Sequence, residues 1–179
     1  MRWNSFGVRT PAVGTDPGVY ALAAEVGRAL LAAGLRVVTA ESCTGGGVAA
    51  ALTDVPGSSQ WFERGYITYS NLAKMQDLGV EAAVLERHGA VSEAVVGQMA
   101  IGALGVSGAD FAVAVSGVAG PLGGTADKPV GLVWFAVARR GAAPQAASAQ
   151  FPGDRAAVRS AAVAMALRLL AGAVDPQSF

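Results

Sequence analysis

One segment decides the fold of this chain: Val37-Val38-Thr39-Ala40-Glu41-Ser42-Cys43-Thr44-Gly45-Gly46-Gly47. Its first four residues are apolar or β-branched, a polar corner follows, and three glycines lead into an alanine-rich run over 48–52. This order predicts a strand, a tight turn and a helix. Glycines in such a turn let a ligand approach the backbone closely.

The turn places Ser42 beside the start of the predicted helix. The first N–H groups of a helix have no partner within it, and the helix dipole gives that end a partial positive charge. A serine hydroxyl next to such donors suits acyl transfer, in which the nucleophile creates an oxyanion that needs hydrogen bonds. The same pattern fits a plain helix cap made by Ser42 and Thr44. The local sequence leaves both interpretations open.

The composition suits one compact α/β domain, because 53% of the 179 residues are hydrophobic and 15% are charged. Lys+Arg and Asp+Glu each number 13, so we expect no surface for nucleic acid or an anionic membrane. No apolar run reaches the roughly 20 residues that a membrane-spanning helix needs. The N-terminus lacks the apolar core of a signal peptide. We therefore expect a soluble, cytoplasmic protein.

Cysteine and histidine each occur only once in the sequence, and this limits the kinds of catalytic or metal site that the chain can form. Cys43 is the only cysteine, which excludes an internal disulfide and a thiolate metal cluster. His88 is the only histidine, which excludes a multi-histidine zinc site and leaves a Ser–His pair only through His88 itself. His88 ends a charged segment that resembles a helix end, where a histidine favours the dipole without any catalytic role. No acidic cluster suggests a Mg²⁺ site, so we predict no metal and no cofactor.

The rest of the chain alternates helices with apolar strands. Residues 1–15 show no periodicity and are predicted to form an arm before a single domain over 16–179. Helices are expected over 17–33, 72–78, 81–87, 93–106 and 155–171, and strands over 35–40, 65–69, 111–115, 130–138 and 146–151. This alternation predicts an α/β fold with a central, mostly buried sheet of about five strands, covered on both faces. In such sheets ligands gather where strands end in glycine-rich turns, here after Ala40 and after Val115.

Ser42 needs a proton acceptor, and Tyr69 and Lys74 are the candidates. Tyr69 is expected to end the second strand, and Lys74 to lie in the first turn of the following helix. The helix dipole disfavours a cation there, and burial would add to this, so the lysine pKa would fall and the amine could act as a base. A surface lysine and a core tyrosine are the simpler interpretations.

Polar groups near the second turn are further candidates. Ser116 follows the third predicted strand and either binds a ligand or only makes the turn. Arg155 and Arg159 lie one turn apart near the start of the last helix, which suits an anionic group between them or a solvated surface.

Several blocks, taken in order, resemble the CinA C-terminal domain family. They include Ala40-Glu41-Ser42-Cys43-Thr44-Gly45-Gly46, Thr68-Tyr69-Ser70-Asn71-Leu72-Ala73-Lys74, Ser116-Gly117-Val118-Ala119-Gly120-Pro121 and Gly153-Asp154-Arg155. The resemblance runs from about residue 16 to residue 170. It implies a three-layer α/β/α sandwich, a protein that is commonly dimeric, and no metal. The family's stand-alone members hydrolyse the carboxamide of nicotinamide mononucleotide to nicotinate mononucleotide and ammonia.

Carried over to this sequence, the family's nucleophile falls on Ser42, and its catalytic tyrosine and lysine fall on Tyr69 and Lys74. The resemblance also places Ser116 at the active site. We expect backbone N–H groups of residues 43–46 to bind the oxyanion, and the loop over 116–125 to hold ribose and phosphate. The residues predicted to bind the substrate nucleotide are Thr44, Gly45, Gly46, Ser116, Gly117, Gly120 and Arg155.

The expected protein is thus a homodimer or higher homo-oligomer that acts on a small nucleotide in pyridine-nucleotide recycling. Whether Lys74 or Tyr69 takes the serine proton stays open. Three alternatives also stay open: an amidase for a related carboxamide, a catalytically silent nucleotide-binding module, and an oligomeric scaffold, which the alanine-rich final helix would suit.

Overall fold

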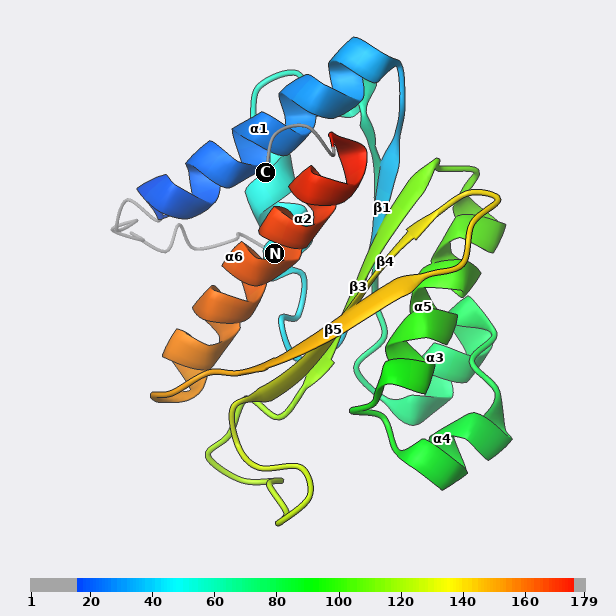
Figure 1. The fold of residues 1–179 in the computed structure, drawn as a ribbon, viewed down its shortest axis with the longest axis vertical. Coiled ribbons are helices and arrows are strands. Elements are labelled where there is room, and N and C mark those ends of the chain that lie inside the picture. The colour runs from blue at the N-terminus through cyan, green and yellow to red at the C-terminus, as the bar shows by residue number, and fades with distance from the viewer. Residues whose placement is uncertain (1–15, 176–179) are drawn as a thin grey trace, which may run out of the picture.

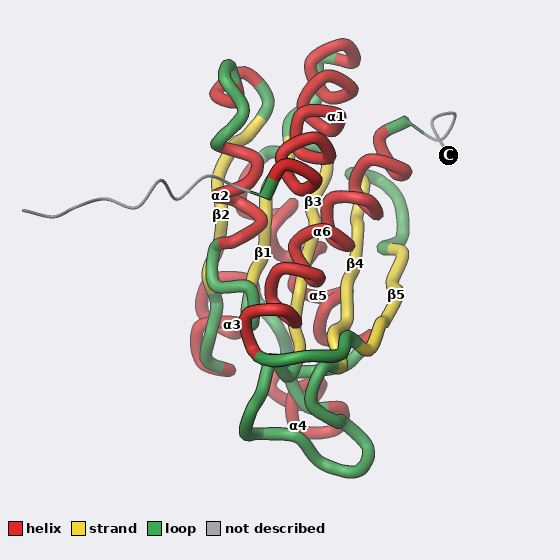
Figure 2. The backbone as a smooth tube through the Cα atoms, turned by 90° about the vertical axis from the view of Figure 1, so that its left-hand side faces the viewer, coloured by secondary structure: helices red, strands yellow, loops and turns green. Residues whose placement is uncertain are grey.

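The structure, a computed structural model, describes residues 16–175 and places them around one five-stranded sheet (Figure 1). The predicted arm over 1–15 lies outside the described residues. The strands are β1 (Val37–Glu41), β2 (Phe62–Ile67), β3 (Phe111–Gly117), β4 (Leu132–Arg139) and β5 (Gln145–Gln150). Their order across the sheet is β2-β1-β3-β4-β5, which Figure 2 shows from left to right. β1 pairs in parallel with β2 and β3, whereas β4 and β5 join as antiparallel strands.

Helices cover both faces of the sheet and confirm the predicted three-layer α/β/α architecture. The helices are α1 (Pro17–Ala33), α2 (Gly47–Thr53), α3 (Asn71–Leu78), α4 (Ala82–His88), α5 (Glu93–Ser107) and α6 (Arg155–Val174), with a 3-10 turn η1 (Ser58–Gln60). In Figure 1, α1, α2 and α6 lie on one side of the sheet, and α3, α4 and α5 lie on the other.

The core divides into two layers because successive side chains of a strand point to opposite faces. Val37 of β1 packs into the layer beneath α1, α2 and α6, whereas its neighbour Val38 packs into the layer beneath α5. Both side chains are completely buried. A strand that is apolar on both faces, such as β1, is therefore explained by helices on both sides.

Local signals set the helix ends. The Asp16 carboxylate accepts hydrogen bonds from the N–H groups of Gly18 and Val19, and Pro17 occupies the first helical position of α1. Gly34 ends α1 with a φ of 66°, a left-handed conformation that glycine adopts without a steric cost. These ends lie where the sequence predicted them.

Several predicted strand bounds differ from the structure, and two of these differences involve a candidate residue. Tyr69 does not end β2, which stops at Ile67, opposite the last residue of β1. Ser116 does not follow β3 but lies within it, because pairing with Trp134 of the antiparallel β4 extends the strand to Gly117. Pairing between distant segments, rather than local sequence, sets both ends.

The length and composition of α6 bear on the expectation that no apolar run is long enough to span a membrane. This helix has 20 residues and a mean hydropathy of 1.6 over its most apolar window, so it passes that test by length and composition. Seven of its residues belong to the buried core. The helix also packs against α1, β3 and β4. Its apolar character is therefore explained by its place in the core.

Candidate active site

Three polar positions meet where the parallel strands end. Ser42 follows β1, Thr68 follows β2, and Ser116 lies next to the last residue of β3. The carboxyl ends of parallel strands share one edge of a sheet, where α/β proteins place their ligand sites. The backbone ties the three ends together, since Ser42 N–H donates to the Val115 carbonyl and Thr68 N–H donates to the Glu41 carbonyl.

The central contact of this edge joins Ser42 to Lys74. The Lys74 ammonium Nζ lies 3.1 Å from Ser42 Oγ and donates to it, and a second bond of 2.7 Å runs to the Thr68 carbonyl. Lys74 comes from α3, whose start is fixed by the Ser70 hydroxyl accepting from Ala73 N–H. A lysine on a helix therefore reaches a serine that lies 32 residues away in the chain.

Lys74 is 1% exposed. Burial penalises its charged form and lowers the pKa of the amine from 10.5, and only the neighbouring Cys43 acts in the opposite direction. No carboxylate within residues 16–175 forms a salt bridge with it. A lysine in this setting has a larger neutral fraction near pH 7 than a surface lysine, and only a neutral amine can accept the serine proton.

Cys43 is unsuited to be the nucleophile. Its side chain is 5% exposed, and burial raises the pKa of the thiol to about 11. A thiol with that pKa stays protonated at neutral pH, whereas the nucleophilic form is the thiolate. Between these two neighbours, Ser42 is the better candidate.

A pocket of about 270 Å³ opens beside Ser42 and Lys74. Its lining includes most of the predicted site residues: Ser42, Tyr69, Lys74, Ser116, Gly117, Gly120 and Arg155. The structure thus brings the predicted nucleophile, amine and phenol to one cavity. His88, exposed at the end of α4, does not line it.

The phenol of Tyr69 is held by Arg155 rather than by Ser42. Arg155 Nη2 donates to the Tyr69 hydroxyl oxygen over 2.9 Å, and Arg155 Nη1 donates to the Gly120 carbonyl over 3.0 Å. Tyr69 is 59% exposed. Arg155 therefore links the loop after β3 to the segment after β2 at the mouth of the pocket.

Ser116 lies deeper, with its side chain 1% exposed. Its hydroxyl donates to the Ala90 carbonyl over 2.8 Å, which joins β3 to the segment between α4 and α5. Because the proton is used in this bond, the lone pairs of Ser116 Oγ stay available as acceptors. Next to it, a Cβ on Gly117 would lie 2.8 Å from the Leu132 carbonyl oxygen, so only glycine fits there.

The start of α2 differs from the expectation in an important way. The buried Glu41 carboxylate accepts hydrogen bonds from the N–H groups of Gly46, Val48 and Ala49. Gly45 N–H donates to the Ser42 carbonyl. Both glycine N–H groups are therefore already hydrogen-bonded, in contrast to the expectation that residues 43–46 all offer N–H groups to an oxyanion, and Thr44, Gly45 and Gly46 do not line the pocket.

Two N–H groups of the turn remain available. Among residues 16–175, the backbone N–H groups of Cys43 and Thr44 have no hydrogen-bond partner in another residue. Thr44 itself is buried, and its hydroxyl also has no partner there. The N–H groups of Cys43 and Thr44 are therefore the donors of the turn that an oxyanion on the Ser42 adduct could use.

Comparison with known proteins identifies the family of this chain. The model of the CinA C-terminal domain matches residues 19–174. The chain belongs to the CinA C-terminal domain family. It is 55% identical over 156 residues to the nicotinamide-nucleotide amidohydrolase PncC of Escherichia coli, a match that covers 87% of this chain and 94% of the relative. It is 53% identical over 152 residues to the protein of the same name from Pseudomonas putida, with 85% and 94% covered.

Solved structures of CinA proteins share the fold. The competence/damage inducible protein CihA from Agrobacterium tumefaciens superposes with a TM-score of 0.86 at 44% identity, covering 88% of this chain and 96% of that one. A CinA superfamily protein from Escherichia coli superposes with a TM-score of 0.82 at 38% identity, covering 92% and 94%.

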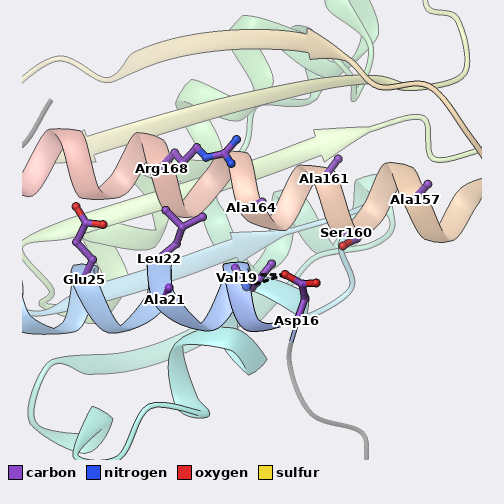
Figure 3. Close-up of a pocket in the computed structure, with 11 residues that line it drawn as sticks. Asp16, Val19, Ala21, Leu22, Glu25, Ala157, Ser160, Ala161, Ala164 and Arg168 are labelled. Atoms are coloured by element: carbon purple, nitrogen blue, oxygen red, sulfur yellow. Dashed lines mark hydrogen bonds between the residues drawn. The ribbon is translucent and has the colours of Figure 1, made fainter.

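Several cavities of this CinA domain are larger than the pocket beside Ser42, and one of about 660 Å³ is lined by the predicted residue Arg155. Another of about 580 Å³ runs between α1 and α6, with Leu22 and Glu25 on one helix and Ala164 and Arg168 on the other (Figure 3). It contains neither a nucleophile next to a base nor a buried lysine. Within residues 16–175 no group of three or more His, Cys, Asp or Glu side chains is placed to hold a metal ion.

Sequence reasoning missed the partners that build the CinA site. No role is predicted for Glu41 from the sequence, although an acidic residue next to a helix start is a recognisable signal, because a carboxylate there satisfies free N–H groups. The Thr68 carbonyl and the Ala90 carbonyl carry no sequence signal at all, since every residue has one.

Proposed function

We propose that this protein hydrolyses the carboxamide of a nicotinamide nucleotide, with nicotinamide mononucleotide as the first substrate to test and Ser42 as the nucleophile. The observation that carries the proposal is the 3.1 Å contact between Ser42 Oγ and the buried Lys74 amine at the wall of a pocket. The names of the relatives, nicotinamide-nucleotide amidohydrolase, support the substrate class.

Lys74 activates Ser42 in this proposal. The neutral amine accepts the hydroxyl proton over the existing contact while one of its N–H groups stays bonded to the Thr68 carbonyl. Ser42 Oγ then attacks the carboxamide carbon, and the carbonyl oxygen becomes an oxyanion. Lys74 is preferred to Tyr69 as the base because the amine contacts Ser42, whereas the phenol oxygen accepts from Arg155.

The oxyanion is bound by the N–H groups of Cys43 and Thr44, which have no partner in another residue among residues 16–175. An N–H donor without a partner before the reaction stabilises the negative charge that appears only during the reaction. Loss of one such donor lowers turnover by about 10²–10³-fold. The Glu41 carboxylate contributes indirectly, since its three hydrogen bonds hold α2 against the end of β1.

Departure of the amine needs a proton, since an amide ion is too basic to leave. The protonated Lys74 supplies it, the carbon–nitrogen bond breaks, and ammonia leaves behind an acyl–Ser42 ester. Water then attacks the ester carbon and gives its proton to Lys74, and Ser42 leaves with a proton returned by the lysine. The products are the nucleotide carboxylate, ammonia and the original enzyme.

The rest of the pocket would orient the substrate. Ser116 Oγ can accept from the carboxamide N–H₂ group, because its own proton is committed to Ala90. The Tyr69 hydroxyl can donate outward, because its oxygen already accepts from Arg155. The Arg155 guanidinium at the pocket mouth provides positive charge for the phosphate.

The test is to incubate purified protein with nicotinamide mononucleotide and to measure both ammonia and nicotinate mononucleotide. We expect equal amounts of the two products, unchanged by a chelator, and none from the Ser42→Ala variant. Binding of the nucleotide without ammonia release would instead indicate a silent nucleotide-binding module. Ammonia from other nucleotide amides but not from this one would indicate an amidase with a different substrate.

A further inference from the structure

Arg159 of α6 contacts the turn that carries Ser42. Its Nε donates to the Cys43 carbonyl over 3.1 Å, and its Nη2 donates to the Thr44 carbonyl over 2.8 Å. These are carbonyls of two consecutive residues, and Arg159 lies more than 100 residues further along the chain. One planar guanidinium therefore holds two peptide units of the turn at once.

The peptide unit between Cys43 and Thr44 depends on this contact. Within the part of the chain that the structure describes, its carbonyl accepts only from Arg159, and its N–H group has no partner. The next unit is held more firmly, since the Thr44 carbonyl also accepts from Gly47 N–H and the Gly45 N–H donates to the Ser42 carbonyl.

A trans peptide unit is planar, so its C=O and N–H point in opposite directions. A side chain that fixes the Cys43 carbonyl therefore also fixes the direction of the Thr44 N–H. Apart from that of Cys43, the other N–H groups close to Ser42 are already committed, those of Ser42 and Gly45 to carbonyls and that of Gly46 to Glu41. The direction of this one peptide unit therefore decides whether Thr44 can serve the oxyanion.

We propose that Arg159 is a positioning residue for the oxyanion site: by holding the Cys43 and Thr44 carbonyls, it keeps those oxygens away from the reacting carbon and the Thr44 N–H free. The inference rests on the proposed function. Without Arg159, rotation of the Cys43–Thr44 unit would replace a donor by a carbonyl oxygen, whose partial negative charge repels an oxyanion.

The structure offers a competing role that the test must separate. Arg159 does not line the pocket of Ser42, but together with Arg155 it lines a neighbouring cavity of about 660 Å³. A guanidinium that bound the substrate phosphate would contribute to ground-state binding, so its loss would raise KM. Loss of oxyanion stabilisation would lower kcat and leave KM nearly unchanged.

The experiment compares Arg159→Ala with Arg168→Ala, in steady-state assays of ammonia release from nicotinamide mononucleotide. Arg168 is an exposed arginine of the same helix that lines the separate α1–α6 cavity (Figure 3). We expect Arg159→Ala to lower kcat by about 10²–10³-fold, the effect of losing one oxyanion donor. We expect its KM to change less than about threefold, well below the hundredfold scale of that kcat effect. Added guanidinium ion should restore part of its kcat, and Arg168→Ala should match the wild type.

The inference is overturned if Arg159→Ala keeps kcat within about threefold of the wild type, far short of the loss of an oxyanion donor. It is also overturned if the loss appears only in KM. If the alanine variant does not fold, Arg159→Lys replaces it, because one ammonium cannot reproduce the fork that spans two carbonyls.

A measurement that needs no activity separates this inference from the proposed function. In ¹⁵N-labelled protein, Arg159→Lys should shift the Thr44 amide resonance and change its hydrogen exchange, while the Gly46 amide, held by Glu41, changes less. An unchanged Thr44 amide would refute the role of Arg159 even in an active enzyme. No ammonia from the wild type, with a shifted Thr44 amide, would refute the proposed function instead.

Discussion

Replacement of Lys74 by methionine is the most direct test of how Ser42 is activated. Methionine keeps an unbranched apolar side chain in the buried site but removes the amine that lies 3.1 Å from Ser42 Oγ. General base catalysis alone contributes about 10²–10⁴-fold. Since the same amine also returns its proton to the leaving group, we expect the upper end, a loss of about 10⁴ in kcat, which corresponds to roughly 5 kcal/mol of transition-state stabilisation.

The fold should survive this change. Lys74→Met leaves the buried Thr68 carbonyl without its donor, which costs about 1–3 kcal/mol. The substitution also removes an ammonium whose burial is unfavourable, and this offsets part of the loss. A net change of about 1 kcal/mol would move Tm by only about 2–4 °C in a domain of this size. Leu72→Met, on an exposed position of the same helix, is the matched control and should keep wild-type kcat.

The pH dependence gives a second readout of the same amine. Burial lowers the pKa of Lys74, so its neutral, catalytic form accumulates as the pH rises through a value below 10.5. Turnover by the wild type should therefore rise with pH and level off before 10.5, and Lys74→Met should show no such rise. The free energy of unfolding should also rise with pH. The buried charge destabilises the fold fully below the lowered pKa, and this penalty is relieved as the pH rises from there towards 10.5.

The assay follows ammonia release from nicotinamide mononucleotide between pH 6 and pH 10, with Tm measured for every variant. The mechanism is refuted if Lys74→Met retains more than a tenth of wild-type turnover, a far smaller loss than removal of a general base produces. It is also refuted if the variant keeps the alkaline rise of the wild type, since another group would then be the base.

Three further predictions concern the neighbours of this amine. Ser42→Ala should lower kcat by several orders of magnitude, on the order of 10⁶-fold for comparable serine nucleophiles, while Cys43→Ala should keep most of the kcat. The reverse result in ammonia assays would identify the cysteine as the nucleophile. Glu41→Gln should destabilise the domain, because an amide cannot accept three N–H bonds and charge-assisted bonds contribute about 1.5–3 kcal/mol each; thermal unfolding with an unchanged Tm would contradict this. Tyr69→Phe should reduce kcat/KM by about 5–10-fold, the loss of one hydrogen bond of about 1 kcal/mol, whereas a loss as large as that of Lys74→Met would make the phenol the base.

Much of the architecture could be predicted from local sequence because its signals act over a few residues. The Asp16, Ser70, Ser92 and Asp154 side chains each accept from an N–H group in the first turn of the helix that follows. The apolar strands likewise indicated a sheet covered on both faces, and the order of helices and strands indicated the α/β class. The strand ends were harder to predict, because pairing with distant strands decides that β2 stops before Tyr69 and that β3 extends past Ser116.

The sequence by itself therefore determined the strand–turn–helix that presents Ser42, the limits of most helices, and a family whose pattern pointed to Lys74 and Tyr69. Only the tertiary structure decided which groups meet: the Lys74 amine with Ser42, the Glu41 carboxylate with the start of α2, and Arg159 with the turn. Helix caps and turns depend on neighbours in the chain, whereas these contacts join segments that become neighbours only when the sheet forms. Burial is decided at the same stage, and it is burial that lowers the pKa of Lys74.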